Sequence, residues 1–334
     1  MIITRTPMRV SFLGGGTDYP QHFLKHGGQT LGAAIDKYTY VTAKRLPDLF
    51  DYRIRVSYSR IELVKDIDAI EHPAVRESLR FCGIAGGIEV GVVADLPARS
   101  GLGSSSSFTV GLLHALHAHQ GHLADRTQLA AEAVHVEQDM IPERVGVQDQ
   151  YTCATGGLCW ITCNKDGSVH AAPLPLTAER RKALEDSLLL FDTRIQRHAH
   201  EVLEEQIQRT TQGELTADLS HLSKLVDQGV QALSGNGSLD EFGGLLHDAW
   251  MIKRRLSSQI SNGVIDGYYE TARKAGAVGG KLLGAGAGGF LLIYARPQDQ
   301  ERVRKALAPL HSVRFSFDYT GSTILFYHPE REDY

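Results

Sequence analysis

Four consecutive serines follow two glycines in residues 101–107, which read GLGSSSS. Apolar residues alternate over 88–94, Pro97 ends that stretch, and a helical pattern begins at Ser104. A glycine turn that opens a helix presents free backbone N–H groups at the positive helix end, which favours an anion. Serine hydroxyls can also donate to phosphate or coordinate a Mg²⁺ that bridges phosphates. One serine is enough to cap a helix, so four in a row favour a phosphate site.

Glycine-rich runs occur twice more, at residues 14–16 and 284–289. The pattern GxxxxGK[ST] of P-loop NTPases is absent, because the lysine of Gly280-Lys281 is followed by leucine. The run at 284–289 satisfies GxGxxG by letter, but it leads into the apolar stretch 290–295 instead of a helix. A dinucleotide fingerprint needs a strand before it and a helix after it, so a dehydrogenase is disfavoured.

Two carboxylates lie downstream of the serine segment. Glu137 is at the end of the next helical stretch, and Asp149 follows in GVQDQ, residues 146–150. On the residues alone, each is more simply interpreted as a surface carboxylate than as a metal ligand or a base.

The composition is that of a globular protein with an excess of glycine. The chain has 334 residues, 42% of them hydrophobic and 22% charged, with a formal net charge of -4 and 34 glycines. A nucleic-acid binder usually has a basic excess or a basic stripe, and this chain shows neither. It contains no apolar run of membrane-spanning length and its first residues do not read as a signal peptide, so we expect a cytoplasmic protein. Neither its four cysteines nor its histidines have the spacing of a metal site.

The element pattern predicts an α/β (α+β) protein in two parts. Strands are expected over 2–13, 33–45 and 88–94, and helices over 104–119 and 125–139. The sequence APLPLTA near 173–178 indicates a boundary. Beyond it, leucines and valines at helical spacing between 215 and 233 predict a helix, and 290–295 predicts a buried strand. A further helix near 298–309 and strands near 312–317 and 322–327 complete the pattern.

Several motifs occur in an order that resembles the GHMP kinases, the family of galactokinases, homoserine kinases, mevalonate kinases and phosphomevalonate kinases. They are Pro7-x-Arg9, Gly16-Thr17-Asp18-Tyr19, Pro97-x-x-x-Gly101-Leu102-Gly103-Ser104-Ser105, Gly146-x-x-Asp149-Gln150 and Lys281-Leu-x-Gly284-Ala-Gly-x-Gly-Gly289. The resemblance covers about residues 4–295. It implies a two-domain fold, with an ATP-binding domain over 1–175 that contains a left-handed β-α-β unit. A ferredoxin-like α+β domain is expected over 176–334, with the active site between the two.

The resemblance also implies roles for individual residues. Asp149 matches the general base and Arg9 the cation beside it. Ser105 and Glu137 match the ligands of Mg²⁺. The residues expected to bind ATP are Pro97, Gly101, Leu102, Gly103, Ser104, Ser105, Ser106 and Gly286. Those expected to bind the acceptor are Gly15, Gly16, Thr17, Asp18, Arg197, Lys253, Gly284 and Ala285.

The resemblance is narrower around GGGTDYP and around residues 246–262 and 276–290, where it points to the branch that phosphorylates heptose 7-phosphates at the anomeric hydroxyl. Galactokinases carry Glu-His where this chain has Gly15-Gly16, so we expect an enlarged acceptor pocket that suits a longer sugar than galactose. A phosphorylated acceptor also needs cations distant from Arg9, and Arg197 and Lys253 match basic positions in that branch. The product would enter synthesis of nucleotide-activated heptose for capsule, S-layer or lipopolysaccharide.

Other readings stay open at this stage. The acceptor could instead be an unphosphorylated fucose-like or arabinose-like sugar. A non-catalytic sensor of sugar and nucleotide is disfavoured by the intact Arg9, Ser105, Glu137 and Asp149, and a decarboxylase by the sugar-kinase-like Arg9 and Thr17-Asp18. The expected partners are small molecules, with neither nucleic acid nor membrane, and a homo-oligomer is compatible with the sequence.

Overall fold

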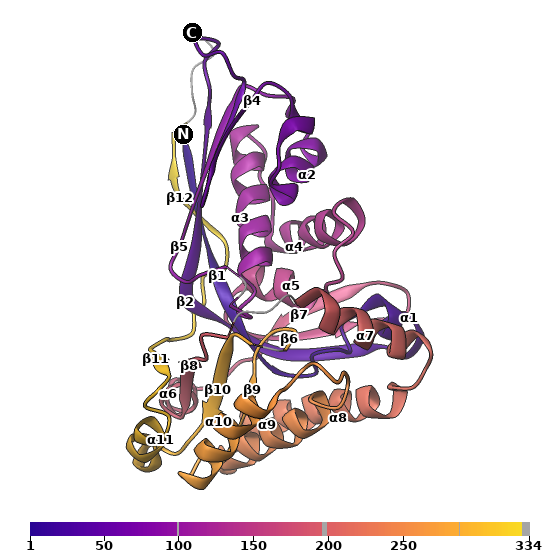
Figure 1. Cartoon of the computed structure of the whole chain (residues 1–334), viewed down its shortest axis with the longest axis vertical. Helices are drawn as coiled ribbons and strands as arrows, with labels where there is room; N and C mark the ends of the chain where they lie inside the picture. The colour runs from indigo at the N-terminus through magenta and orange to yellow at the C-terminus, as the bar shows by residue number, and fades with distance from the viewer. Residues whose placement is uncertain (99, 196–198, 287, 329–334) are drawn as a thin grey trace.

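The computed structural model describes residues 1–98, 100–195, 199–286 and 288–328, which form an elongated molecule built on two sheets (Figure 1). The larger sheet has eight strands. Six follow the order β12-β1-β2-β5-β3-β4, and β6 and β7 extend from β2. Its strands are β1 (Ile2–Leu13), β2 (Gly28–Arg45), β3 (Ile54–Ser57), β4 (Ile61–Val64), β5 (Ile88–Ala94), β6 (Leu158–Cys163), β7 (Val169–Pro173) and β12 (Thr323–Tyr327). All their pairings are antiparallel except that of β3 with β5.

The smaller sheet has four antiparallel strands in the order β11-β8-β10-β9. They are β8 (Leu188–Asp192), β9 (Gly279–Leu282), β10 (Phe290–Tyr294) and β11 (His311–Val313). Helices connect β8 to β9 and β10 to β11. This strand order and these connections confirm the ferredoxin-like second part. The hand of the β-α-β unit in the first part stays a prediction.

Helices pack against both sheets. In Figure 1, α2, α3 and α4 lie along the same side of the large sheet, α9 and α10 lie beside the small sheet, and α8 packs against α9 and against strands β1 and β2. The helices are α1 (Pro20–His26), α2 (Pro73–Phe81), α3 (Ser104–His119), α4 (Arg126–His135), α5 (Gln148–Thr155), α6 (Ala178–Asp186), α7 (Ala199–Thr211), α8 (Thr216–Ser234), α9 (Asp240–Lys253), α10 (Gly263–Lys274) and α11 (Gln300–Ala306). A π-helical turn, Val136–Met140, extends α4, and 3₁₀ turns occupy Ile67–Ala69 and Pro297–Asp299. No helix within the described ranges is both long and apolar enough to cross a membrane.

One hydrophobic core joins the two sheets. Met8, Val10 and Phe12 of β1 belong to the same buried cluster as Leu291 and Leu292 of β10. Burial of large apolar side chains stabilises a fold by about 1.5–3 kcal/mol each. This shared core therefore holds loops from the two halves of the chain in fixed relation to each other.

Most of the expected elements are present, but the last strand of the chain belongs to the large sheet and not to the small one. Strand β12 pairs with β1, for example Ile2 with Tyr327, so the chain returns to the large sheet after completing the small one. The expected second domain over 176–334 therefore contributes a strand to the sheet of the first. A strand's own residues define its pattern of burial but not its neighbour, so the sequence could not reveal this pairing. The expected strand over 33–45 begins earlier, at Gly28, and the one near 312–317 is shortened to β11.

Candidate active site

The serine segment forms the N-terminus of a long buried helix. Gly103 precedes α3 with a φ of 70°, in the left-handed region that favours glycine. No side chain caps the helix, and the N–H of Ser107 donates to the Gly103 carbonyl at 2.8 Å. The turn before Ser107 therefore keeps its N–H groups available at the positive end of a 16-residue helix. This arrangement fits the phosphates of a nucleotide.

Two glycine loops meet backbone to backbone beside this helix. A Cβ added to Gly101 would lie 2.7 Å from the Leu283 carbonyl oxygen, and one added to Gly284 would lie 2.6 Å from the Gly101 Cα. Both residues also have φ near 80°, at 77° and 78°. We expected glycines of this run to contact ligands, Gly284 the acceptor and Gly286 the ATP. At Gly284 the structure gives a different reason for glycine, because its missing side chain makes room for the other loop.

Arg9 of β1 connects this loop to Asp149 at the start of α5. Its Nε and Nη2 donate to the two carboxylate oxygens of Asp149 at 2.7 and 2.6 Å, and Nη1 donates to the Gly101 carbonyl at 2.7 Å. Burial opposes the charge on the guanidinium, but Asp149 outweighs it and raises the pKa of Arg9. Such a two-bond pair fixes the orientation of the carboxylate as well as its charge. Leu102 is fully buried and its carbonyl accepts the Arg9 N–H at 2.9 Å.

Asp18 joins the first glycine run to the segment before α5. One carboxylate oxygen accepts the Gly16 N–H at 3.0 Å, and the other accepts the Gln148 N–H at 3.3 Å. Burial raises the pKa of Asp18, and Asp149 adds to this effect against the backbone hydrogen bonds. Thr17 is fully buried and its hydroxyl lies 2.8 Å from the carbonyls of Gly14 and Gln29, so it holds the turn.

Glu137 lies in the π-helical turn, buried behind the serine segment. Its carboxylate accepts hydrogen bonds from Ser106 at 2.9 Å, Thr109 at 2.7 Å and Gln150 at 2.5 Å, which are uncharged donors. Burial outweighs these bonds and raises the pKa of Glu137 to about 7. A buried carboxylate beside the two neutral hydroxyl oxygens of Ser106 and Thr109 is a donor set that suits a hard cation such as Mg²⁺. The bonded serine is Ser106, whereas Ser105, the expected magnesium ligand, is exposed.

Lys253 at the end of α9 reaches the same region from the second half of the chain. Its Nζ donates to the Gly284 carbonyl at 2.6 Å. Burial, with the charge of Arg9 next, lowers the pKa of Lys253 to about 8, while Asp18 and Asp149 act in the opposite direction. We expected a cation distant from Arg9. The structure instead places Lys253 near enough to Arg9 for their charges to repel, because α9 ends at the loop contact.

A cavity of about 440 Å³ lies between these groups. Of the predicted site residues, those that line it are Arg9, Gly15, Gly16, Asp18, Gly101, Gly103, Ser104, Ser105, Asp149, Lys253, Gly284, Ala285 and Gly286. The predicted residues that are not among its lining are Pro97, Leu102, Ser106, Glu137 and Thr17. Arg197 lies outside the described residues.

We expected the missing side chain of Gly16 to enlarge the acceptor pocket, but the space beside Gly16 is filled. A Cβ there would lie 3.1 Å from the Gln206 Nε2, 3.2 Å from Leu219 and 3.5 Å from Leu256. Side chains from α7, α8 and the segment after α9 therefore occupy the space that a larger residue would fill. Gly15 still lines the cavity, where its Cβ would meet only ordinary contacts.

Sequence reasoning missed six polar residues in the cavity lining, namely Ser11, Tyr19, Glu143, Arg144, Gln148 and Gln206. Tyr19 and Gln148 are next to the predicted Asp18 and Asp149, and that adjacency was the available signal. Ser11 lies in an apolar strand, and Gln206 lies in a helix that carries none of the motifs. A further missed group, Lys281, is buried behind the cavity and donates to the Phe12 carbonyl at 2.9 Å.

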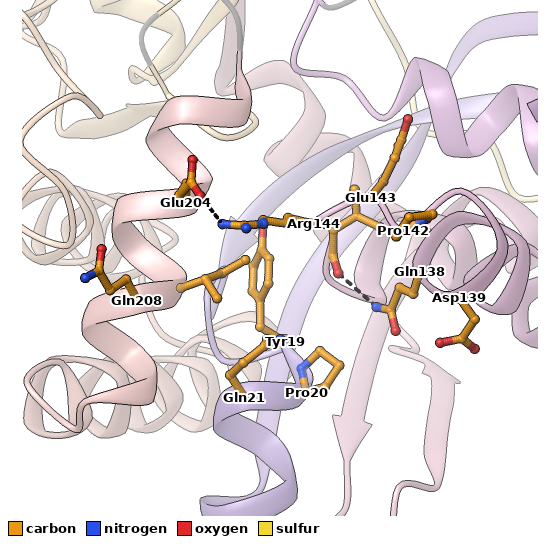
Figure 2. Close-up of a pocket in the computed structure, with 12 residues that line it drawn as sticks. Tyr19, Pro20, Gln21, Gln138, Asp139, Pro142, Glu143, Arg144, Glu204 and Gln208 are labelled. Atoms are coloured by element: carbon orange, nitrogen blue, oxygen red, sulfur yellow. Dashed lines mark hydrogen bonds and ion pairs between the residues drawn. The ribbon is translucent and has the colours of Figure 1, made fainter. Parts of the chain in front are cut away.

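A second cavity of about 630 Å³ adjoins the first, and both are lined by Tyr19, Glu143, Arg144 and Val145. Figure 2 shows Arg144 extending across to Glu204 of α7, where Nη1 and Oε1 are 3.0 Å apart. This ion pair connects the segment before α5 to the second half of the chain.

Two family models match the chain, GHMP kinases N terminal domain over residues 63–157 and GHMP kinases C terminal over residues 230–310. The chain is 26% identical to the D-glycero-alpha-D-manno-heptose 7-phosphate kinase of Campylobacter jejuni, over 96% of each protein. It is 28% identical to the L-fucokinase/L-fucose-1-P guanylyltransferase of Bacteroides fragilis, over 93% of this chain and 37% of that one. A crystal structure titled as a D-glycero-D-manno-heptose 1-phosphate kinase from Bacteroides thetaiotaomicron is similar in fold, with a TM-score of 0.81 and 21% identity over 98% of this chain and 100% of that one.

Proposed function

Because the chain belongs to the GHMP kinases and is a sugar kinase of that family, we propose that it transfers the γ-phosphoryl group of ATP to the anomeric hydroxyl of D-glycero-α-D-manno-heptose 7-phosphate. The product is the 1,7-bisphosphate. The similarity to the Campylobacter jejuni enzyme along almost the whole of both chains supports this acceptor.

The observation that carries the proposal is the position of the Arg9–Asp149 pair. Arg9 contacts the Gly101 carbonyl of the phosphate loop and both carboxylate oxygens of Asp149, and both residues line the cavity. A hydroxyl bound in that cavity can give its proton to Asp149 while it attacks the phosphorus. Arg9 and Lys253 then offset the negative charge around the transferred group. Phosphoryl transfer depends mainly on such positioning and charge neutralisation.

The nucleotide phosphates would lie against the N-terminus of α3 and the loop at 101–105. Glu137, with Ser105 or Ser106, would hold Mg²⁺, which neutralises phosphate charge when it is bound. The chain's own part is to keep the Glu137 carboxylate buried beside the hydroxyls of Ser106 and Thr109, so that a cation at the phosphates finds a fixed negative partner.

The acceptor's own phosphate needs a cation away from the reacting hydroxyl. Among the described residues that line the two cavities, the cations are Arg9, Lys253 and Arg144. The first two lie near Asp149, and Arg144 lies on the wall that the cavities share. We therefore assign the 7-phosphate to Arg144, which would exchange its bond to Glu204 for one to phosphate.

A coupled assay of ADP release tests the proposal, with heptose 7-phosphate, unphosphorylated heptose, mannose, galactose and fucose as acceptors. We expect kcat/KM to be highest for heptose 7-phosphate, and ³¹P NMR of the product to show a phosphate on C1. Turnover confined to an unphosphorylated sugar would overturn the proposed acceptor. The absence of turnover with every acceptor would favour a sensor of sugar and nucleotide.

A further inference from the structure

Helix α7 buries a glutamine where its pattern calls for an apolar residue. Leu203, Gln206 and Thr210 are the buried positions of this face, exposed by 9%, 4% and 9%. The Thr210 hydroxyl is satisfied by the Gln206 carbonyl at 2.8 Å. The Gln206 side-chain amide has no hydrogen-bond partner among the described residues, and it lines the 440 Å³ cavity. Because this amide faces the cavity and its donor and acceptor are not used by the described residues, both are available to a ligand bound there.

Two other side chains without partners converge on the same place. The Ser11 hydroxyl of β1 is buried and unpartnered, and the half-buried Gln148 amide has no side-chain partner within the described ranges. The Cβ positions of Gly15 and Gly16 locate all three. The Gln148 Nε2 and the Ser11 Oγ lie 3.5 and 3.6 Å from the Gly15 position, and the Gln206 Nε2 lies 3.1 Å from the Gly16 position.

These three side chains come from segments far apart in the sequence, and the hydrogen bonds of the described residues around them do not use their polar atoms. Each amide offers both a carbonyl acceptor and an N–H₂ donor, and the serine hydroxyl can act in either sense. A sugar presents adjacent hydroxyls that also donate and accept. The set therefore matches an uncharged polyol better than a phosphate, which would ask for donors only.

We propose that Gln206, together with Gln148 and Ser11, binds hydroxyl groups of the acceptor sugar, and that Gln206 determines which sugar is accepted. The inference rests on the proposed function and names residues of the same site. Gln206 belongs to the second half of the chain and Asp149 to the first, so the acceptor is held from both sides of the cavity. A site built to hydrogen-bond a hydroxyl rejects analogues that lack it, because its own polar groups are then left unpaired.

The test compares Gln206→Met with wild type and with Gln212→Met, a matched control that is exposed just after the same helix and lines neither cavity. We expect Gln206→Met to raise KM for the acceptor at least tenfold and to leave KM for ATP within twofold. Its melting temperature without ligands should not fall, since methionine keeps the length of the side chain and removes an unpaired amide. Gln212→Met should leave both KM values within twofold.

Deoxy analogues of the acceptor provide a second readout that a structural role would not change. The loss of affinity caused by removing the hydroxyl that Gln206 binds should be large in wild type and nearly absent in Gln206→Met. If the methionine variant does not fold, Gln206→Glu, which is isosteric but lacks the N–H₂ donor, should give the same rise in acceptor KM.

The inference is overturned if acceptor KM is unchanged in Gln206→Met, if ATP KM rises equally, or if Gln212→Met has the same effect. The proposed function fails separately, in the wild-type acceptor screen. If the wild type uses a different sugar, the comparison of variants is made with that sugar and keeps its meaning. A wild type without turnover on any acceptor overturns both.

Discussion

The proposed nucleotide end and the proposed acceptor end of the cavity are built in different ways. The proposed nucleotide end consists of backbone at Gly101, Gly103, 284–286 and Gly288, and the start of α3. The acceptor end consists of side chains from segments spread along the chain, namely Ser11, Asp18, Gln148, Gln206 and Lys253. Arg9 and Asp149 lie where the two ends meet.

Because of this difference, substitutions at the two ends should have different effects. A backbone site binds phosphate by N–H groups that every residue has, so its constraint is the absence of Cβ atoms where loops touch. A side-chain site recognises its ligand through the identity of each group, so a single substitution can change the acceptor. Substitutions at the junction should therefore abolish turnover, those at the nucleotide end should affect stability and ATP, and those at the acceptor end should affect KM for sugar.

The largest effect is expected at the junction, for Asp149→Asn. Asparagine keeps the shape of the side chain but cannot accept the proton of the acceptor hydroxyl. A positioned base contributes about 10²–10⁴-fold to rate, so kcat should fall by that factor. Steady-state kinetics checks the rate, and circular dichroism checks the fold.

Asp186→Asn is the matched control, since Asp186 is exposed and pairs with Lys182 on α6. It should keep the kcat of wild type. Turnover of Asp149→Asn close to that of wild type would remove Asp149 from the role of base.

Glu137→Gln tests the buried carboxylate behind the nucleotide end. Burial raises its pKa to about 7 from a usual value near 4.5, so the folded protein binds more protons than the unfolded chain between these values. The stability of wild type therefore falls as pH rises through this window, and glutamine removes the penalty. Without Mg²⁺, the stability of the variant relative to wild type should increase by about 2 kcal/mol from pH 5 to pH 8. Urea unfolding at the two pH values measures it.

Magnesium with ATP should reverse this ranking. A cation held by Glu137 would stabilise the wild type at pH 8 and leave the variant nearly unchanged. Equal stabilisation of both proteins by magnesium and ATP would mean that Glu137 does not hold the metal.

The sequence predicted the local structure of the serine segment because its residues are adjacent in the chain, while its binding of nucleotide stays a prediction. Residues 101–107 contain the turn, the start of the helix and the serines together, and the structure has α3 begin at Ser104 as expected. The ordered motifs also singled out Arg9 and Asp149, which the fold brings within 2.6 Å of each other.

The acceptor end could not be predicted in the same way. Gln206 reaches Gly16 only because α7 docks beside the first glycine run, and no local pattern around residue 206 indicates that contact. The same reason explains why the expected enlargement of the pocket at Gly16 is not found. The sequence showed that a side chain is missing there, but not that three other side chains fill its place. The return of β12 to β1 is likewise a property of the whole fold.

Gly101→Ala tests whether the nucleotide end depends on the contact between its two loops. The backbone cost of a left-handed residue is about 1–2 kcal/mol, and the 2.7 Å approach to the Leu283 carbonyl adds to it. We expect a total loss of about 2–3 kcal/mol in unfolding free energy and a rise in KM for ATP.

Gly83→Ala is the control that measures the cost of a left-handed alanine backbone alone. Gly83 has a φ of 66°, and a Cβ there meets nothing within 4 Å. The difference between the two variants isolates the loop contact, so equal losses would show that the contact contributes nothing.

The smallest effect is expected for Lys281→Met, behind the acceptor end. Burial, with the charges of Lys253 and Arg9, lowers the pKa of Lys281 well below its usual value. Between the lowered pKa and the usual one, the unfolded chain binds more protons than the folded protein, so this lysine makes stability rise with pH until the unfolded chain also loses the proton. Methionine removes that dependence and gives up one hydrogen bond to the Phe12 carbonyl, worth about 1 kcal/mol. The variant should be the more stable protein at pH 7 and should lose its advantage by about pH 10, near the usual lysine pKa.

Because Lys281 is absent from the cavity lining, both KM values should stay within twofold of wild type. A loss of acceptor affinity would instead extend the acceptor end to this strand and give the buried amine a part in holding the sugar.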